Sequence, residues 1–309
     1  MNEADRAGRR RAARARRRRR RLIALGIVLA ALAAAGAGIA LLVGGGSSAA
    51  PRTTAPPPPP PPPPPRYVGS KLPPQPRPRR RGFLPTLAEQ RNAAARLVKL
   101  GLPILCAGPR GRYIALTFDD GPGEYTELAM KILRKRHMRA TFFLVGRQVT
   151  YRPDLPAKEA ALGALGDHTW THPYLPGLSS AAILDQITST RAEIRRTAKT
   201  DVLLFRPPYG GRDARVDAIV NRLALLQVLW SVDSGDSTGS DVLGVYRNVL
   251  AGLKPGAIIL MHENRATTIK SLIHYVLPAI QRRHLIPVSV PELLALDPPS
   301  YEQVRSRRC

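Results

Sequence analysis

The stretch YIALTFDDGP, residues 113–122, decides the fold. Its first six residues, Tyr113–Phe118, are apolar, aromatic or β-branched and favour a buried strand. The two carboxylates and the Gly-Pro pair that follow favour a turn. The same pattern recurs along the chain beyond residue 106, where each short apolar run is followed by a polar turn and an amphipathic stretch of helical period. Such alternation predicts a parallel sheet with helices packed against it.

The pattern contains seven strands in about 200 residues, which is short for a complete eightfold barrel of about 250 residues. We therefore expect an α/β fold, a distorted, incomplete (β/α) barrel of about seven strands. The expected strands are Tyr113–Phe118, Ala140–Val145, Ala164–Gly166, Leu203–Phe205, Gln227–Ser231, Ala257–Leu260 and Ile286–Val288. The expected helices are Glu124–His137, Ala157–Ala161, Ser180–Thr197, Asp213–Leu223, Gly239–Leu253 and Thr268–Arg283.

The charge of the chain is concentrated near its start. Residues 1–110 carry 22 basic residues against three acidic ones, whereas residues 111–309 carry 26 against 19, within a total net charge of +26. The folded part is therefore only mildly basic. Aromatic residues make up 5% of the chain, and a nucleic-acid surface needs aromatic rings on which bases can stack. The composition argues against nucleic acid as a partner.

The first 43 residues predict a membrane anchor. Residues 1–21 hold eleven arginines and form a cytoplasmic basic arm, and the 22 residues from Leu22 to Val43 carry no charge. At 1.5 Å per residue this helix would span roughly 33 Å, enough for a hydrocarbon core of about 30 Å. By the positive-inside rule we expect a single-pass protein of the cell membrane, with its N-terminus cytoplasmic and the remainder extracellular. A signal peptide cleaved near Ser47–Ala50 is the alternative, although its apolar region would be shorter.

Residues 44–82 form a proline-rich linker that includes ten consecutive prolines, Pro56–Pro65, and is expected to be a semi-rigid spacer. Residues 83–105 are a helical lead-in, with a helix expected over Leu84–Leu100, and residues 106–309 form the globular domain. We expect Cys106 and Cys309, at the two ends of this domain, to form a disulfide, because exported proteins meet oxidising conditions. Two free thiols are the alternative. No segment implies a protein partner.

Ionisable and metal-binding residues follow five of the expected strands. Parallel strands deliver such residues to one end of a barrel, the end where barrel active sites lie. Taken singly, each group has an ordinary interpretation as a turn, a surface pair or a strand end. Together they supply two histidines and a carboxylate for one metal ion, a second carboxylate, a further histidine and an arginine. The residues in question are Asp119, Asp120, Asp167, His168, His172, Arg206, Tyr209, Asp233, Asp236, His262 and Glu263.

Residues 111–297 or so resemble the polysaccharide deacetylases of carbohydrate esterase family 4. The resemblance rests on five motifs in order: TFDDG (117–121), HTWTH (168–172), RPPYG (206–210), DSGD (233–236) and LMH (260–262). One residue departs from the family pattern. The fourth motif usually ends in a tryptophan that lines the acetyl pocket, and Ser237 stands there, so the resemblance does not fix the acyl selectivity.

The resemblance implies a metal-dependent site. Asp120, His168 and His172 would bind a divalent metal, typically Zn²⁺, with Co²⁺, Mn²⁺ or Ni²⁺ as alternatives, and would leave positions open for water and substrate. Asp119 would act as the general base and would be held by Arg206.

The remaining roles also follow from the resemblance. His262 would protonate the leaving amine, and Asp233 would orient His262. The backbone N–H of Tyr209 would bind the oxyanion, and Leu260 would contribute to the substrate site.

The expected reaction is hydrolysis of N-acetyl groups on amino sugars of a cell-wall glycan, with peptidoglycan favoured because the anchor would hold the domain near the wall. An O-acetyl esterase and a chitooligosaccharide deacetylase are alternatives on the same site. Non-haem iron oxygenases share two-histidine, one-carboxylate ligation, but Asp120 lies 48 residues before His168 on a βα scaffold. A catalytically inactive wall-binding module is disfavoured because Asp119 and His262 are both present.

Overall fold

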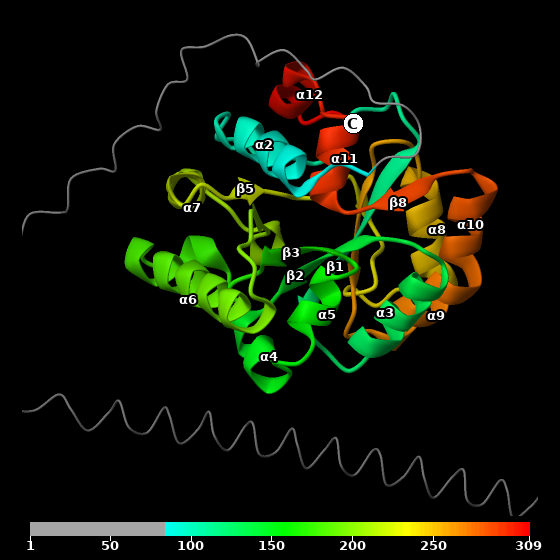
Figure 1. The fold of residues 1–309 in the computed structure, drawn as a ribbon, viewed down its shortest axis with the longest axis horizontal. Coiled ribbons are helices and arrows are strands. Elements are labelled where there is room, and N and C mark those ends of the chain that lie inside the picture. Colours follow the sequence, from blue (N-terminus) through cyan, green and yellow to red (C-terminus); the bar gives the residue numbers. More distant parts are fainter. Residues whose placement is uncertain (1–83) are drawn as a thin grey trace, which may run out of the picture. The chain divides into compact units, whose positions relative to one another are not determined.

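The computed structural model describes residues 84–309 (Figure 1). The predicted basic arm (1–21), membrane span (22–43) and proline-rich linker (44–82) lie outside the described residues. Within residues 84–309, no helix combines the length and the apolar character needed to cross a bilayer. The anchor therefore stays a prediction.

All pairs of strands in the described part of the chain are parallel and belong to one sheet. The strand order is β5-β4-β3-β2-β1-β7-β6, and β8 pairs with the beginning of β1. The strands are β1 (Tyr113–Gly121), β2 (Ala140–Leu144), β3 (Gly163–Asp167), β4 (Leu204–Phe205), β5 (Leu226–Gln227), β6 (Val232–Asp233), β7 (Ile258–His262) and β8 (Ile286–Val288). The expectation of a distorted, incomplete parallel barrel is confirmed.

The expected strand Gln227–Ser231 is wrong in its extent. The chain there forms two separate short strands, β5 and β6, which lie at the two opposite ends of the strand order. Residues 228–231 run from one edge of the sheet to the other, and we call them the closing segment. The backbone N–H of Leu229 donates to the carbonyl of Ile104 at 2.8 Å, and that of Ser231 donates to the carbonyl of Ile258 at 3.0 Å. The barrel is thus closed by a crossing chain instead of by a full strand ladder.

The described helices are α2 (Leu87–Val98), α3 (Thr126–Lys135), α4 (Gly146–Tyr151), α5 (Pro156–Ala160), α6 (Ser180–Ala198), α7 (Ala214–Arg222), α8 (Val242–Gly252), α9 (Ala266–Ser271), α10 (Leu277–Arg282), α11 (Val290–Leu296) and α12 (Tyr301–Ser306). Short helical turns are η1 (Leu175–Gly177), η2 (Pro208–Gly210) and the π-helical η3 (Leu272–Val276). The expected helix Thr268–Arg283 is divided into α9, η3 and α10. Pro278 stands in the first turn of α10 and lacks the N–H that would continue an unbroken α-helix.

Alternation along β1 explains how the sheet positions its polar residues. Ile114, Leu116 and Phe118 belong to the apolar cluster formed with the surrounding helices, whereas Ala115 belongs to the cluster inside the barrel. Both faces are buried, which accounts for the continuous apolar run in the sequence. Because side chains alternate between faces, Asp119 falls on the inner face with Ala115, at the carboxyl end of the strand.

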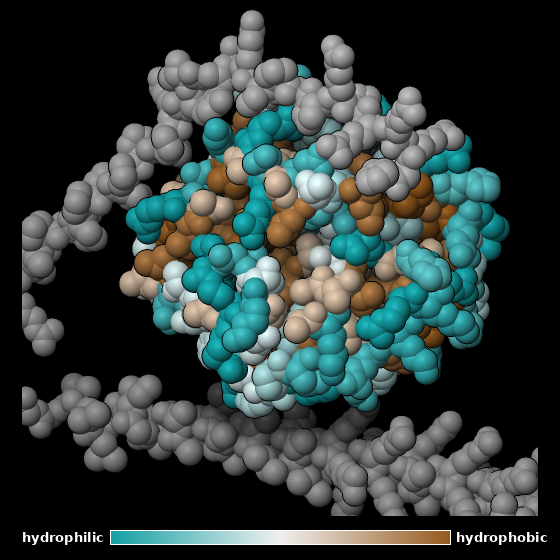
Figure 2. All heavy atoms as spheres, in the orientation of Figure 1, coloured by the Kyte–Doolittle hydropathy of each residue, from teal (hydrophilic) through white to brown (hydrophobic). Residues whose placement is uncertain are grey.

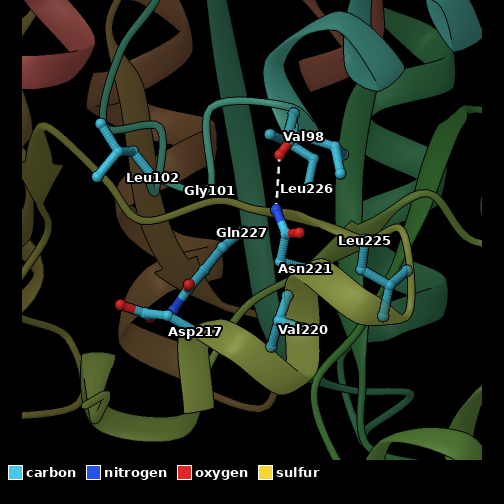
Figure 3. Close-up of a pocket in the computed structure, with 9 residues that line it drawn as sticks. All are labelled: Val98, Gly101, Leu102, Asp217, Val220, Asn221, Leu225, Leu226 and Gln227. Atoms are coloured by element: carbon cyan, nitrogen blue, oxygen red, sulfur yellow. Dashed lines mark hydrogen bonds between the residues drawn. The ribbon is translucent and has the colours of Figure 1, made fainter. Parts of the chain in front are cut away.

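Helix α2 packs against α11 and β5, and its end is tied to α7. Asn221 donates from Nδ2 to the backbone carbonyl of Val98 at 2.7 Å (Figure 3). Beside this bond lies a cavity of about 10 Å³, lined partly by Gly101 and Gln227 (Figure 3). That volume holds about one water molecule, so this cavity is no substrate site.

On the face seen in Figure 2, hydrophobic residues lie between hydrophilic ones.

The expected disulfide is confirmed. Cys106 and Cys309 are bonded, with their Cα atoms 5.9 Å apart, and they are separated by 203 positions in the sequence. Cys106 also forms an isolated antiparallel bridge with Ala257, immediately before β7. The bond therefore ties the segment after α12 to the base of the central strands.

Two buried carboxyl groups link α5 to the turn after β1. Glu159 in α5 and Glu263 directly after β7 are both fully buried, and their carboxyl oxygens have no hydrogen-bond partner among the described residues. Burial raises the pKa of both groups. The carboxyl of Glu263 lies so close to Gly121 that a Cβ there would be 1.4 Å from Glu263 Oε1. The negative charge of either group disfavours ionisation of the other, which adds to the effect of burial.

This pair predicts a stability that depends on pH. Burial raises the pKa of Glu263 to about 8, so the folded domain binds a proton that the unfolded chain releases at lower pH. The contribution of this group to the free energy of unfolding is fully present below the ordinary carboxyl pKa and is lost as the pH rises through about 8. A Glu263→Gln side chain is uncharged at every pH and removes this titration. We expect the melting temperature of Glu263→Gln, followed by circular dichroism, to fall less steeply than wild type between about pH 6 and about pH 9.

The matched control is Glu302→Gln on α12, where the side chain is exposed. It should follow the wild-type curve. A Glu263→Gln curve as steep as that of wild type would contradict the raised pKa of Glu263.

Candidate metal centre and active site

The end of β1 presents two adjacent carboxylates to one imidazole ring. His168 Nε2 lies 3.6 Å from Asp119 Oδ2 and 3.7 Å from Asp120 Oδ1. Neighbouring residues of a regular strand would point to opposite faces. Here the register between β1 and β2 shifts between Asp119 and Gly121, and Asp120 has a φ of 69°. This irregularity brings both carboxylates to the same site.

Asp120, His168 and His172 form a cluster whose ligand atoms all lie within 4.8 Å of one another. His172 Nε2 is 3.2 Å from Asp120 Oδ1. His168 makes a 2.6 Å hydrogen bond between Nδ1 and the carbonyl of Arg206, which fixes its ring with Nε2 toward the cluster. The structure thus brings together the three residues predicted as metal ligands.

This cluster fits a bound cation. Asp120 Oδ1 is buried and accepts no hydrogen bond from the described residues. Burial lowers the pKa of His168 to about 3, so its ring is neutral and offers a lone pair. Two imidazole nitrogens and a carboxylate are a donor set typical of divalent transition metals, and three protein ligands leave positions open for water and substrate.

Four of the nine non-glycine residues with a positive φ in residues 84–309 lie at this site. Asp120 and Thr169 have φ values of 69°, and His172 and Tyr209 have φ values of 60°. Such values are uncommon outside glycine and particularly unfavourable for a β-branched residue such as Thr169. One hydrogen bond within the loop runs from the N–H of His172 to Thr169 Oγ1 at 3.1 Å. Clustering of strained residues is characteristic of functional sites.

Arg206 is fully buried and connects the inner face of β1 to the closing segment. Its Nη1 donates to Asp119 Oδ1 at 2.7 Å and to Thr117 Oγ1 at 2.8 Å. Its Nε and Nη2 donate to the carbonyls of Val228 and Leu229, each at 3.1 Å. The predicted contact between Arg206 and Asp119 is therefore present, and the same guanidinium also holds the closing segment.

Asp119 is held as a basic carboxylate. Burial raises its pKa above the ordinary value, while the charge and hydrogen bond of Arg206 act in the opposite direction. The net increase makes Asp119 a better proton acceptor than an exposed aspartate. The guanidinium of Arg206 in turn stacks over the ring of Phe143, 4.1 Å from its centroid, which restricts its movement.

His262 at the end of β7 is held by Asp236. Its Nδ1–H donates to Asp236 Oδ1 and its backbone N–H donates to Asp236 Oδ2, both at 2.7 Å. Thr268 donates a further hydrogen bond to the same carboxylate. Burial by itself lowers the pKa of His262, but Asp236 outweighs it and raises the pKa to about 9. At neutral pH the ring is therefore protonated, and its Nε2–H is the remaining donor.

The prediction that Asp233 orients His262 is wrong. Asp233 is exposed, and its Oδ1 accepts a hydrogen bond from the N–H of Gly235 at 2.8 Å. Val232 is buried in the same cluster as Phe118, and Asp233 stands at the solvent-exposed end of the short strand β6. The chain reverses at Gly235, where φ is +69°, and this brings Asp236 against β7. No signal in the sequence distinguishes the two aspartates, because both belong to one four-residue motif, DSGD (233–236).

The other two predicted site residues lie at the same end of the barrel. Leu260 is buried in β7, two residues before His262 and therefore on the same face of the strand. Tyr209 is 71% exposed, and its ring meets that of His172 edge-on, with centroids 4.7 Å apart.

Comparisons with known proteins agree with this geometry. Residues 107–228 match the family model described as polysaccharide deacetylase. A chitooligosaccharide deacetylase from Bradyrhizobium sp. is 32% identical over 218 residues, covering 65% of this chain and 94% of the relative. The peptidoglycan-N-acetylglucosamine deacetylase PgdA of Listeria monocytogenes is 32% identical over 205 residues, covering 65% of this chain and 43% of the relative.

Solved structures give the same fold. A pseudoenzyme of carbohydrate esterase family 4 from Bacillus anthracis aligns with a TM-score of 0.59 and 28% identity, covering 65% of this chain and 70% of the other. The chain spans less than half the length of some curated relatives, such as the Listeria protein. It spans nearly all of the Bradyrhizobium protein. Because it has the five motifs, the barrel and a match over nearly all of the Bradyrhizobium protein, the chain belongs to the polysaccharide deacetylase family.

Proposed function

We propose that this protein is a metal-dependent hydrolase that removes N-acetyl groups from the amino sugars of a cell-wall polysaccharide and releases acetate. One observation carries the proposal: an ionisable base and a protonated acid stand at one candidate metal site, each held by its own partner. Asp119 is held by Arg206 and His262 by Asp236. Because the family includes a pseudoenzyme, membership of the family is a weaker argument for activity than the presence of the base, the acid and all three candidate metal ligands.

The residues divide the reaction between them. A divalent ion held by Asp120, His168 and His172, with Zn²⁺ proposed, would polarise the acetamide carbonyl and lower the pKa of water. Asp119 takes one proton from the attacking water as its oxygen joins the carbonyl carbon. The backbone N–H of Tyr209 is proposed to stabilise the oxyanion.

His262 completes the reaction. As the C–N bond breaks, Nε2–H of His262 gives its proton to the nitrogen, because an amine leaves only when protonated. The products are acetate and the free amino sugar. The carboxylate of Asp236 accepts hydrogen bonds from the ring and from the backbone N–H of His262, and its charge keeps the ring protonated until that step.

Peptidoglycan is the proposed substrate. Support comes from the likeness to the Listeria peptidoglycan deacetylase and from the sequence before residue 84, which favours a membrane anchor and a stalk. A tethered domain, extracellular and close to the membrane, would meet the cell's own wall at high local concentration. A chitooligosaccharide deacetylase is the second candidate, because that relative is matched over 94% of its length.

Removing one ligand should remove the metal. We expect the purified protein to carry about one divalent ion per chain, measured by inductively coupled plasma mass spectrometry, and His172→Ala to lose it together with activity. His274→Ala, on η3 away from the cluster, is the control and should keep both. Full activity after exhaustive chelation would contradict a metal-dependent reaction.

Replacing each aspartate of the DSGD motif (233–236) separately by asparagine should separate their roles. His262 acts as an acid, so activity is present below its pKa and falls as the pH rises through about 9. Without the charge of Asp236, burial dominates and the pKa of His262 drops. We expect Asp236→Asn to lower kcat at least about tenfold and to move the alkaline limb of kcat/KM to lower pH. Asp233→Asn should leave the profile unchanged; an equal effect of both variants would contradict the assignment.

The substrate can be tested in the cell and in solution. We expect deletion of the gene to lower the proportion of de-N-acetylated muropeptides measured by mass spectrometry. The purified protein should release acetate from intact peptidoglycan faster than from chitopentaose or acetylxylan. Rapid release from chitopentaose with unchanged muropeptides would favour the second candidate. Release from acetylxylan alone would indicate an O-acetyl esterase.

A further inference from the structure

The turns that lead into β1, β2 and β8 are strongly basic. These three strands are neighbours in the parallel sheet, so their amino ends meet at the end of the barrel opposite to the candidate metal centre. Six basic side chains in these turns are exposed and form no ion pair with an acidic residue among residues 84–309. We call them the basic face: Arg112, Arg134, Lys135, Arg136, Arg282 and Arg283.

Hydrogen bonds between the turns make the basic face continuous. The N–H of Ile286, at the start of β8, donates to the carbonyl of Arg112 at 2.7 Å. Arg136 Nη1 donates to Gln281 Oε1 at 3.0 Å, which joins the end of α3 to the end of α10. Arg283 is held at the same place, because its Nη1 donates to two backbone carbonyls at the end of α8. The three turns therefore form one surface.

Nearly all of the net charge of the domain is accounted for by this face. Residues 111–309 hold 26 basic and 19 acidic residues, an excess of seven, and the three turns contain no acidic residue. Basic residues in the last turn of a helix stabilise its dipole, which explains Arg134, Lys135 and Arg282. The dipole does not explain Arg112, which precedes a strand. Six unneutralised positive charges on one surface attract an anionic partner.

An apolar side chain stands within the basic face. Ile286 is 47% exposed, next to Arg112 and three residues after Arg283, while the adjacent Leu285 and Pro287 are buried and fix its backbone. A soluble polyanion offers this isoleucine no apolar contact. A bilayer offers both anionic head groups for the basic residues and an acyl boundary in which an apolar side chain is buried. The combination favours a membrane surface over a soluble polymer.

We propose that the basic face docks the domain on a bilayer that contains anionic phospholipids, with Ile286 at the boundary between head groups and acyl chains. Because the strands are parallel, the carboxyl ends that bear Asp119 and Asp120 then point away from the membrane. The predicted span at residues 22–43 would attach the chain but would not orient the domain, so docking is a separate property. It is also independent of the reaction that the site catalyses.

Arginine footprinting tests the docking in the full-length protein. The protein is combined with nanodiscs of phosphatidylcholine, alone or mixed with phosphatidylglycerol, and phenylglyoxal modification of each arginine is followed by peptide mass spectrometry. We expect modification of Arg112, Arg136 and Arg282 to slow at least about fivefold on the anionic discs, since one basic residue at an anionic surface contributes roughly that factor to binding. The protection should weaken as salt is raised. Arg147, which is exposed on α4, should show no difference between the discs.

Variants separate docking from general attraction of a basic chain, and any attachment through residues 1–83 is common to all of them. Arg136→Glu/Arg282→Glu should abolish the protection of Arg112, which this variant retains, and Ile286→Ser should reduce it. The matched control Arg147→Glu/Lys270→Glu changes the net charge equally at exposed positions on α4 and α9 and should keep the protection.

Three results would overturn membrane docking. The first is equal modification of Arg112 on neutral and anionic discs. The second is protection of Arg112 that survives Arg136→Glu/Arg282→Glu or is unaffected by Ile286→Ser. The third is stronger protection by poly(glycerol phosphate), added to neutral discs at the same phosphate concentration, which would assign the face to a soluble polyanion.

Discussion

The fully buried guanidinium of Arg206 is the interaction on which the rest of the structure depends. An isolated buried cation is strongly unfavourable, and a buried charge is tolerated only when it is paired and hydrogen-bonded. Arg206 meets this requirement with a carboxylate, a hydroxyl and two backbone carbonyls. Because these partners come from β1 and the closing segment, one side chain fixes the base of the proposed reaction and closes the barrel.

At β7, too, one side chain holds a reacting group through more than one hydrogen bond. The carboxylate of Asp236 binds the ring of His262 through Nδ1–H, and a second hydrogen bond from the backbone N–H of His262 keeps that carboxylate in place. Base and acid stand on neighbouring strands, since Asp119 and His262 are paired in the register of β1 and β7. The buried carboxyl groups of Glu159 and Glu263 are close to this position, since Glu263 is the residue that follows His262. Precision at the site thus comes from the partners of the reacting groups as much as from the groups themselves.

Much of this arrangement was predictable from the sequence. The apolar runs locate β1, β2 and β8 closely, and the polar residues behind successive strands identify the metal ligands, Asp119 and Arg206. The sequence could not show that residues 226–233 cross between two sheet edges, because a crossing chain and a strand have the same apolar composition. It also could not separate Asp233 from Asp236 by type. Their roles depend on the reversal of the backbone at Gly235, which brings Asp236 against β7.

The left-handed backbone at Asp120, Thr169, His172 and Tyr209 has a consequence for the evolution of the domain. Each such residue costs on the order of 1–3 kcal/mol relative to a relaxed conformation, and together they form a sizeable fraction of the stability of an ordinary domain. Glycine at Thr169 or Tyr209 would relieve that strain. Those changes would keep the candidate metal ligands, whereas glycine at Asp120 or His172 would relieve strain and remove a ligand, so selection for stability alone acts against the metal site itself.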